Sequence, residues 1–95
     1  MNKKMMQQLQ QLQKEMNETQ EKLLMTEFEG KATGVRIVML GSHQVVEINI
    51  DEDLFSDKEM TQDAILLAIN DAVENVRKTT ESEMSRFTTG LGLGF

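Results

Sequence analysis

Cysteine, proline, tryptophan and tyrosine are all absent from this chain of 95 residues. Without cysteine there can be no disulfide framework, no thiolate ligand for zinc or iron–sulfur clusters and no nucleophilic chemistry at sulfur. Without proline, nothing interrupts long helices. No stretch approaches the ~18 apolar residues of a membrane-spanning helix, and MNKKMM is followed by QQLQQLQKE rather than by the apolar core of a signal peptide. We therefore expect a cytoplasmic protein without membrane contact.

Signals for catalysis and metal binding are equally scarce. The single histidine, His43, lies beside a predicted turn without a nucleophile–base arrangement around it. The stretch DEDLFSD begins like a calcium loop, but Phe55 replaces an oxygen ligand and Gln62 replaces the closing glutamate. GLGLGF has the wrong spacing for a nucleotide-binding loop, so residues 89–95 are expected to form a flexible tail whose Leu and Phe side chains could contact a neighbour. We expect no enzyme activity, cofactor, metal or small-molecule substrate.

Apolar residues recur at heptad spacing over the first 25 residues. Their positions are spaced alternately four and three apart: Met5, Leu9, Leu12, Met16, Thr19 and Leu23. Glu18 and Lys22 add an i,i+4 pair in the favoured order. This pattern predicts a helical arm over residues 1–25, about 30 Å or more long. The apolar seam must be covered, either by another helix of the same chain or by a second copy, and the sequence leaves both possibilities open.

Two apolar stretches, VRIVML and QVVEINI, flank the tripeptide GSH and predict a β-hairpin. If the loop has two residues and begins with Gly41, Leu40 faces His43. In that register Arg36 lies directly opposite Glu47 on one face of the hairpin. The other face is apolar and carries Val35, Ile37, Met39, Val46, Ile48 and Ile50.

A short edge strand around residues 27–29 completes a three-stranded antiparallel sheet within residues 26–50. The face that carries Arg36 also carries Val38, Leu40 and Val45, so it is only half polar. Two helices can cover one face of so small a sheet, but covering the second face calls for another subunit. A monomeric core would also be marginal at this length. We therefore predict a homodimer.

A second long helix is predicted over residues 56–88. Ser56 and Glu59 have the spacing of a capping box at its start. A broad apolar stripe follows, made of Met60, Ala64, Ile65, Leu67, Ala68, Ile69, Ala72, Val73 and Val76. Beyond this stripe only Met84 and Phe87 are apolar. We therefore expect the end of the helix to project as a mostly solvated arm.

The formal charge of -6 is unevenly distributed. Residues 44–75 hold nine acids against the single Lys58, whereas the two ends of the chain are neutral to slightly basic. Six cations near the free ends of the two helices are candidates for phosphate contacts: Lys3, Lys4, Lys14, Arg77, Lys78 and Arg86. A few such contacts are enough for salt-sensitive binding, and a dimer would double them. Because aromatic stacking platforms are lacking, duplex DNA is favoured over single strands.

The predicted order of helix, three strands and helix resembles the YbaB/EbfC family of bacterial nucleoid-associated proteins. The motifs that carry the resemblance are GVRIVMLG (34–41), VEINID (46–51), DKEM (57–60) and LLAINDA (66–72). They correspond to the family's second strand, third strand and last helix, and the similarity covers nearly the whole chain. The resemblance implies an α-β-β-β-α fold, an obligate homodimer with tweezer-like projecting helices, and DNA binding in the cytoplasm and nucleoid by those helices.

Residues and resemblance together predict one α+β domain spanning residues 1–95. Its predicted function is non-catalytic binding of duplex DNA by a homodimer through its helical arms, with effects on nucleoid organisation or gene expression. The alternative is a dimeric protein-interaction module that grips a protein partner and has little or no DNA affinity. The apolar seam and the eight methionines suit this alternative.

Overall fold

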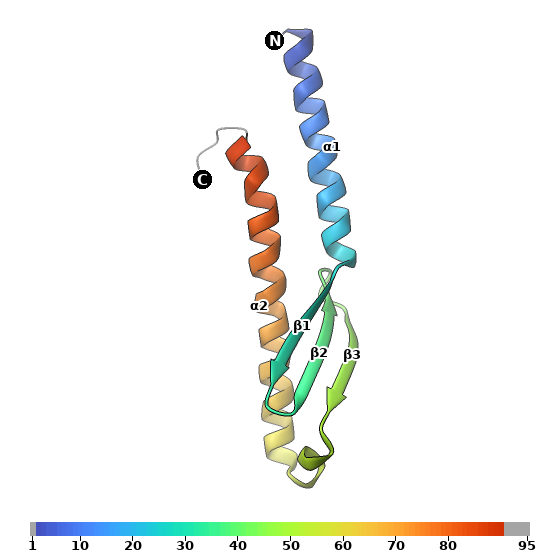
Figure 1. Cartoon of the computed structure of the whole chain (residues 1–95), viewed down its shortest axis with the longest axis vertical. Coiled ribbons are helices and arrows are strands. Elements are labelled where there is room, and N and C mark those ends of the chain that lie inside the picture. Colours follow the sequence, from blue (N-terminus) through green and yellow to red (C-terminus); the bar gives the residue numbers. More distant parts are fainter. Residues whose placement is uncertain (1, 91–95) are drawn as a thin grey trace.

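The computed structural model describes residues 2–90, with the side chains of residues 2–88, and its elements follow the predicted order (Figure 1). These elements are α1 (Lys3–Met25), β1 (Glu27–Ala32), β2 (Val35–Leu40), β3 (Val45–Ile50), the 3₁₀ helix η1 (Glu52–Ser56) and α2 (Lys58–Gly90). The strands form one antiparallel sheet in the order β1-β2-β3, which confirms the predicted fold class. The molecule is elongated, 68 × 23 × 11 Å, because both helices run beyond the sheet. The predicted tail contacts of Leu91, Leu93 and Phe95 lie outside the described residues.

Helix α2 packs on β1 and β2 and covers one face of the sheet. The core between them consists of Val35, Ile37, Met39, Leu54, Ala64, Ala68, Ala72 and Val76. Gly30 of β1 approaches the helix so closely that a Cβ atom on it would lie 2.1 Å from the Ala68 carbonyl oxygen and 2.6 Å from the Ala72 Cβ. The predicted strand at 27–29 was therefore too short, because Gly30 is a packing contact inside β1 rather than the end of the strand.

The outer edge of β1 is closed by two side chains of α2. The Lys31 backbone N–H donates to Asp71 Oδ2 at 2.9 Å, and Asn75 Nδ2 donates to the Glu29 carbonyl oxygen at 2.8 Å. These bonds satisfy backbone groups that would otherwise be open to pairing with another strand. This edge of the sheet is therefore protected within the protomer.

The opposite edge strand, β3, is exposed on both faces. Ile48 pairs with Ile37 and so lies on the face that α2 covers, yet it remains 47% exposed because α2 packs over β1 and β2. Val45 and Val46 are exposed to a similar degree. On α2, Asp71 and Asn75 lie on one side of the row of buried alanines and bond to the β1 edge. The apolar stripe on the other side of these alanines therefore lies toward β3. This stripe consists of Ile65, Ile69 and Val73, each of which directly follows a buried alanine; Val73 is exposed and the two isoleucines are partly buried.

The β2–β3 loop has three residues rather than the predicted two. The His43 N–H donates to the Leu40 carbonyl oxygen at 2.8 Å, and the Leu40 N–H donates to the Gln44 carbonyl oxygen at 2.9 Å. His43 takes a positive φ of 72°, the left-handed position that a three-residue hairpin loop requires. Gly41 serves a different purpose, since a Cβ atom on it would lie 1.9 Å from the Leu23 carbonyl oxygen at the end of α1.

The register of β3 is shifted by two residues over most of the strand. The longer loop accounts for one residue, and a β-bulge between the Val38 and Met39 pairings accounts for the other. Arg36 lies opposite Asn49 rather than Glu47, so the predicted direct pairing was wrong. Beyond the bulge the even shift keeps the side chains on their predicted faces, and Ile37 accordingly pairs with Ile48. At the bulge the prediction was wrong, because Val45 pairs with Met39 although the two were predicted on opposite faces. Arg36 still reaches Glu47 diagonally, with 2.5 Å between Nη1 and Oε2, so the predicted ion pair is present.

Arg36 also contacts Glu29 of β1, with Nη2 2.7 Å from Oε1, and so links all three strands. Its hydrogen bonds hold the pKa values of both glutamates below their ordinary value. Carboxylates with a lowered folded-state pKa stabilise the fold above their unfolded pKa, and this stabilisation is lost as pH falls through the folded pKa. We expect Arg36→Met to lower the melting temperature slightly at pH 7, with the difference from wild type shrinking below pH 4.5. Thermal unfolding followed by circular dichroism tests this, and a difference that grew on acidification would contradict it.

Helix α2 begins at Lys58, two residues after the predicted start. Asp57 Oδ1 accepts a hydrogen bond from the Met60 N–H at 3.0 Å, so Asp57 is the N-cap and the predicted capping box at Ser56 was wrong. Ser56 instead closes η1, where its hydroxyl donates to the Asp53 carbonyl oxygen at 3.2 Å. The 3₁₀ turn thus takes up the residues between the sheet and the helix.

Candidate nucleic-acid interface

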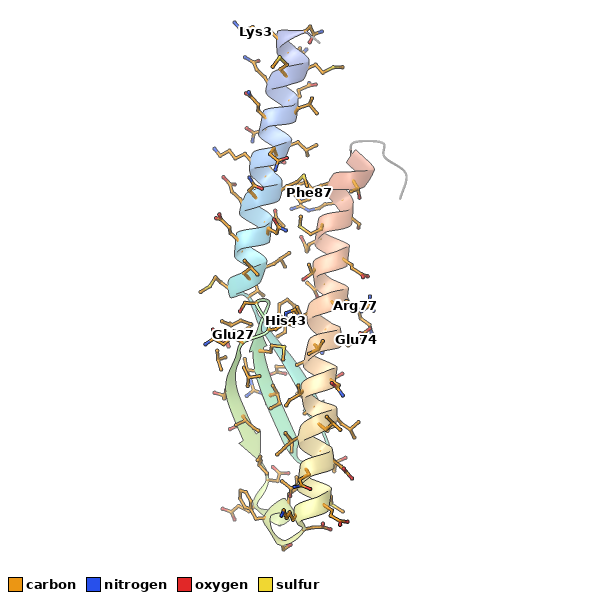
Figure 2. All side chains as sticks on the ribbon, turned by 180° about the vertical axis from the view of Figure 1, so that it is seen from behind. Lys3, Glu27, His43, Glu74, Arg77 and Phe87 are labelled. Atoms are coloured by element: carbon orange, nitrogen blue, oxygen red, sulfur yellow. The ribbon has the colours of Figure 1, made fainter. Side chains whose placement is uncertain are left out.

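Above the sheet, α1 and α2 pack side by side in antiparallel orientation (Figure 1). This pair is here called the helical hairpin, although the sheet rather than a short loop connects the two helices. Phe87 of α2 lies between the two helices and is 2% exposed, and Leu23 of α1 is buried as well (Figure 2). The end of α2 therefore packs on α1 through Phe87, while most of its other side chains beyond Val76 are exposed, as predicted. The heptad seam is covered in part by α2 of the same chain. Beyond the end of α2 the seam is uncovered in the protomer, and Met5 and Leu9 are half-exposed.

Lys3 and Lys4 lie at the projecting tip of this hairpin, in the first turn of α1 (Figure 2). That turn contains no acidic residue, and within the described residues neither lysine has a carboxylate at ion-pair distance. The Asn2 side chain caps the helix by accepting the Met5 N–H at 2.7 Å. Cations at a helix N-terminus are disfavoured by the helix dipole, so these lysines are not there to stabilise the helix. The positive end of the α1 helix dipole and the two lysines together give the tip a positive charge.

Arg77 is held by two carboxylates of its own helix. Its guanidinium lies 2.5 Å from Glu74 Oε1 and 2.9 Å from Glu81 Oε2, on the side of α2 turned away from α1 (Figure 2). The hydrogen bonds that Arg77 donates to Glu74 and then to Glu81 raise the pKa of Arg77 above its ordinary value, and Arg77 lowers the pKa of Glu74. The three groups together carry a net negative charge. Arg77 is therefore a poor phosphate ligand as it stands.

Arg86 and Lys14 are also engaged. Arg86 Nη2 donates to Thr19 Oγ1 of α1 at 3.2 Å, and its Nε lies 3.7 Å from Glu83 Oε2. Lys14 lies 4.0 Å from Glu18 Oε1 on an exposed face of α1, where such a pair is weak. Arg86 lines an open cleft between the helices together with Glu15, Glu18, Thr19 and Lys22. The two glutamates balance Lys22 and Arg86, so the cleft has no excess positive charge to favour a phosphate.

Lys78 and Lys22 complete the set of cations on the hairpin. Within the part of the chain that the structure describes, neither has a carboxylate at ion-pair distance. Lys22 was not among the predicted contacts, although it lines clefts between the helices with Arg86 and with Thr79. Lys22 lies in the last turn of α1, where a lysine commonly stabilises the helix through its dipole. Its place in the sequence therefore does not single it out as a binding residue.

The six predicted cations thus do not gather into one patch. Only Lys3 and Lys4 are neighbours at an exposed end, while the others are spread along the hairpin or paired with acids. Among residues 2–90, no group of three or more His, Asp or Glu side chains could hold a metal ion. None of the helices in this range has the length and apolar character to cross a membrane.

Comparison with known proteins agrees with this architecture. The sequence profile of the YbaB/EbfC DNA-binding family matches residues 1–91. The fold is similar to the crystal structure of an uncharacterized protein, HP0035, from Helicobacter pylori, with a TM-score of 0.71 and 25% sequence identity. The alignment covers 90% of this chain and 96% of the other. Because the family profile spans nearly all of the sequence, the chain belongs to the YbaB/EbfC DNA-binding family.

Proposed function

We propose that this protein is a nucleoid-associated protein of the cytoplasm that binds duplex DNA without catalysis, as a homodimer, through its helical hairpins. The observation that carries the proposal is the pair Lys3 and Lys4 in the acid-free first turn of a projecting helix. Two unpaired cations at a positive helix end favour a polyanion. Membership of a DNA-binding family supports DNA as this polyanion, and the lack of aromatic stacking platforms favours a duplex over single strands.

The dimer is supported by the asymmetry of the sheet. The β1 edge is closed by Asp71 and Asn75, whereas β3 keeps an open edge and half-exposed Val46 and Ile48. Exposed apolar strands of this kind invite pairing and apolar burial. A second copy that covered β3 and the stripe of Ile65, Ile69 and Val73 would bury both. It would also bring a second hairpin to the same DNA.

DNA contacts by the hairpin tips would be made to phosphates. Lysine binds phosphate as a point charge and carries no base specificity in such contacts. Asn2, the amide side chain nearest these lysines in sequence, is already occupied as the helix cap. We therefore expect weak, sequence-tolerant binding that falls steeply with salt. Four tip lysines in a dimer would give a slope of log K against log salt of about −3 to −4.

Fluorescence anisotropy with a labelled random-sequence duplex tests the DNA proposal. At low salt we expect the variant Lys3→Gln with Lys4→Gln to bind about tenfold more weakly and to lose most of the salt slope. Arg77→Gln serves as the matched control and should change affinity much less, because its charge is already balanced by Glu74 and Glu81. Absence of binding at tens of micromolar protein, or binding indifferent to salt, would refute DNA binding. A larger loss in the control would refute the assignment to the tips.

A further inference from the structure

The end of the molecule opposite the hairpin tips carries an exposed aromatic side chain. This end, here called the base, comprises residues 51–63, which form η1 and the first turns of α2 (Figure 1). Phe55 is 68% exposed and Met60 is 53% exposed, whereas Phe87 is buried and Phe28 is partly buried. A large apolar side chain so far out of the core has no cover in the protomer.

Phe55 does not hold the base together. The anchor of η1 is its neighbour Leu54, which is 5% exposed and belongs to the core. The Thr61 hydroxyl donates to the Leu54 carbonyl oxygen and ties the turn to α2. These contacts fix the backbone of η1 and direct Phe55 outward. The aromatic ring is therefore available for another molecule at little cost to the fold.

The surroundings of Phe55 and Met60 are strongly acidic. Residues 51–63 contain six carboxylates and the single Lys58. Among the described residues, no ion pair involves any of these groups. Asp57 has a local task as the cap of α2, but Glu52, Asp53 and Asp63 remain exposed charges with no structural partner of opposite sign. Phe55 and Met60 are thus surrounded by negative charges that no ion pair neutralises.

We propose that the base is a docking surface for a cationic protein segment that seats Phe55 and Met60 against apolar side chains and surrounds them with Lys or Arg. Aromatic anchors in a charged rim are typical of the centre of protein interfaces. DNA is disfavoured because its phosphates would face the carboxylates. A second copy is disfavoured as well, because a two-fold interface sets a patch against itself and would oppose six carboxylates with six.

This surface is separate from the proposed DNA contact in position and in sign of charge. The base and the tips of the hairpin lie at opposite ends of the 68 Å long axis (Figure 1). A protomer could therefore hold DNA at one end and a basic protein at the other. The docking proposal does not depend on DNA binding, since each surface has its own residues.

A synthetic amphipathic peptide of lysine and leucine is the probe, with a peptide of equal charge in which serine replaces leucine as its control. Binding to the full-length protein is followed by calorimetry and by NMR chemical-shift mapping. We expect the leucine peptide to bind more tightly than the serine peptide and to perturb residues 52–63. Phe55→Ala should weaken binding about tenfold or more, whereas Met25→Ala, at 73% exposure in the wild type, should not.

Two further measurements keep the outcome unambiguous. Light scattering on Phe55→Ala should give the wild-type mass, and a changed mass would assign Phe55 to a subunit interface and overturn the docking proposal. DNA affinity of the same variant should be unchanged, which separates this surface from the proposed DNA contact. Equal peptide binding by wild type and Phe55→Ala, or shifts confined to other segments, would also overturn the proposal.

Discussion

Replacement of Gly30 by alanine is expected to destabilise the fold by about 3 kcal/mol or more. The added Cβ atom would lie 2.1 Å from the Ala68 carbonyl oxygen, 2.4 Å from the Ala72 backbone nitrogen and 2.6 Å from the Ala72 Cβ. Two of these three atoms belong to the helix backbone and cannot turn away as a flexible side chain can. Strand β1 would have to move off α2, which opens the core around Ala68 and Ala72. Denaturant unfolding of the purified variant measures the loss.

Whether Gly30→Ala lowers or raises the stability of the fold distinguishes the effect of tertiary packing from that of strand propensity. Glycine weakens a strand relative to alanine, so strand preference alone predicts that Gly30→Ala would stabilise the protein. Thr33→Ala, in the exposed turn after β1, provides a control that adds no atom to the packed interface. Wild-type stability of Gly30→Ala would show that β1 and α2 do not approach as closely as described.

The second large effect is expected for Ile48→Glu, which should convert the proposed dimer into a monomer. Ile48 is half-exposed in the protomer, so the variant should fold, but a second copy packed on β3 would bury the new carboxylate. An unpaired buried charge costs several kcal/mol, which corresponds to a rise of about 100-fold or more in the dimer dissociation constant. Sedimentation equilibrium or light scattering at micromolar concentration measures the mass directly.

Gln20→Glu adds the same charge on the exposed surface of α1 and should leave the mass unchanged. A wild-type protein that sediments as a folded monomer would refute the dimer altogether. A dimer that persisted in Ile48→Glu would place the subunit contact elsewhere than on β3. Since two hairpins per particle strengthen DNA binding by effective concentration, the monomeric variant should also bind duplex DNA more weakly.

Several features of the fold could be predicted because they depend on neighbours in the sequence. The heptad spacing from Met5 to Leu23 predicts α1, and the alternation in the two strands around Gly41 predicts the hairpin. The ion pair between Arg36 and Glu47 was predicted from a register that was wrong by two residues. It survives because side chains alternate with a period of two, so an even shift leaves both residues on the same face and within reach.

Other features could not be predicted from local patterns. A glycine in a β-hairpin loop is normally expected to be the residue with positive φ, but here His43 takes that conformation. Gly41 is needed instead because a side chain there would collide with the Leu23 carbonyl group. Gly30 reads as the end of a strand, although it is where β1 meets α2. In each case the choice was made by an element distant in the sequence, whose position no local pattern contains.

The candidate site divides in the same way. The sequence alone determined the element order, the acidic middle of the chain and the six cations on the two helices. Only the tertiary structure decided that Arg86 bonds to Thr19 across the hairpin, that Phe87 is buried against α1 and that the tip with Lys3 and Lys4 projects alone. Composition and periodicity are properties of short stretches of chain. Whether a charged or apolar side chain is free to bind another molecule depends on which residues distant in the sequence lie next to it. Only the folded structure determines those neighbours.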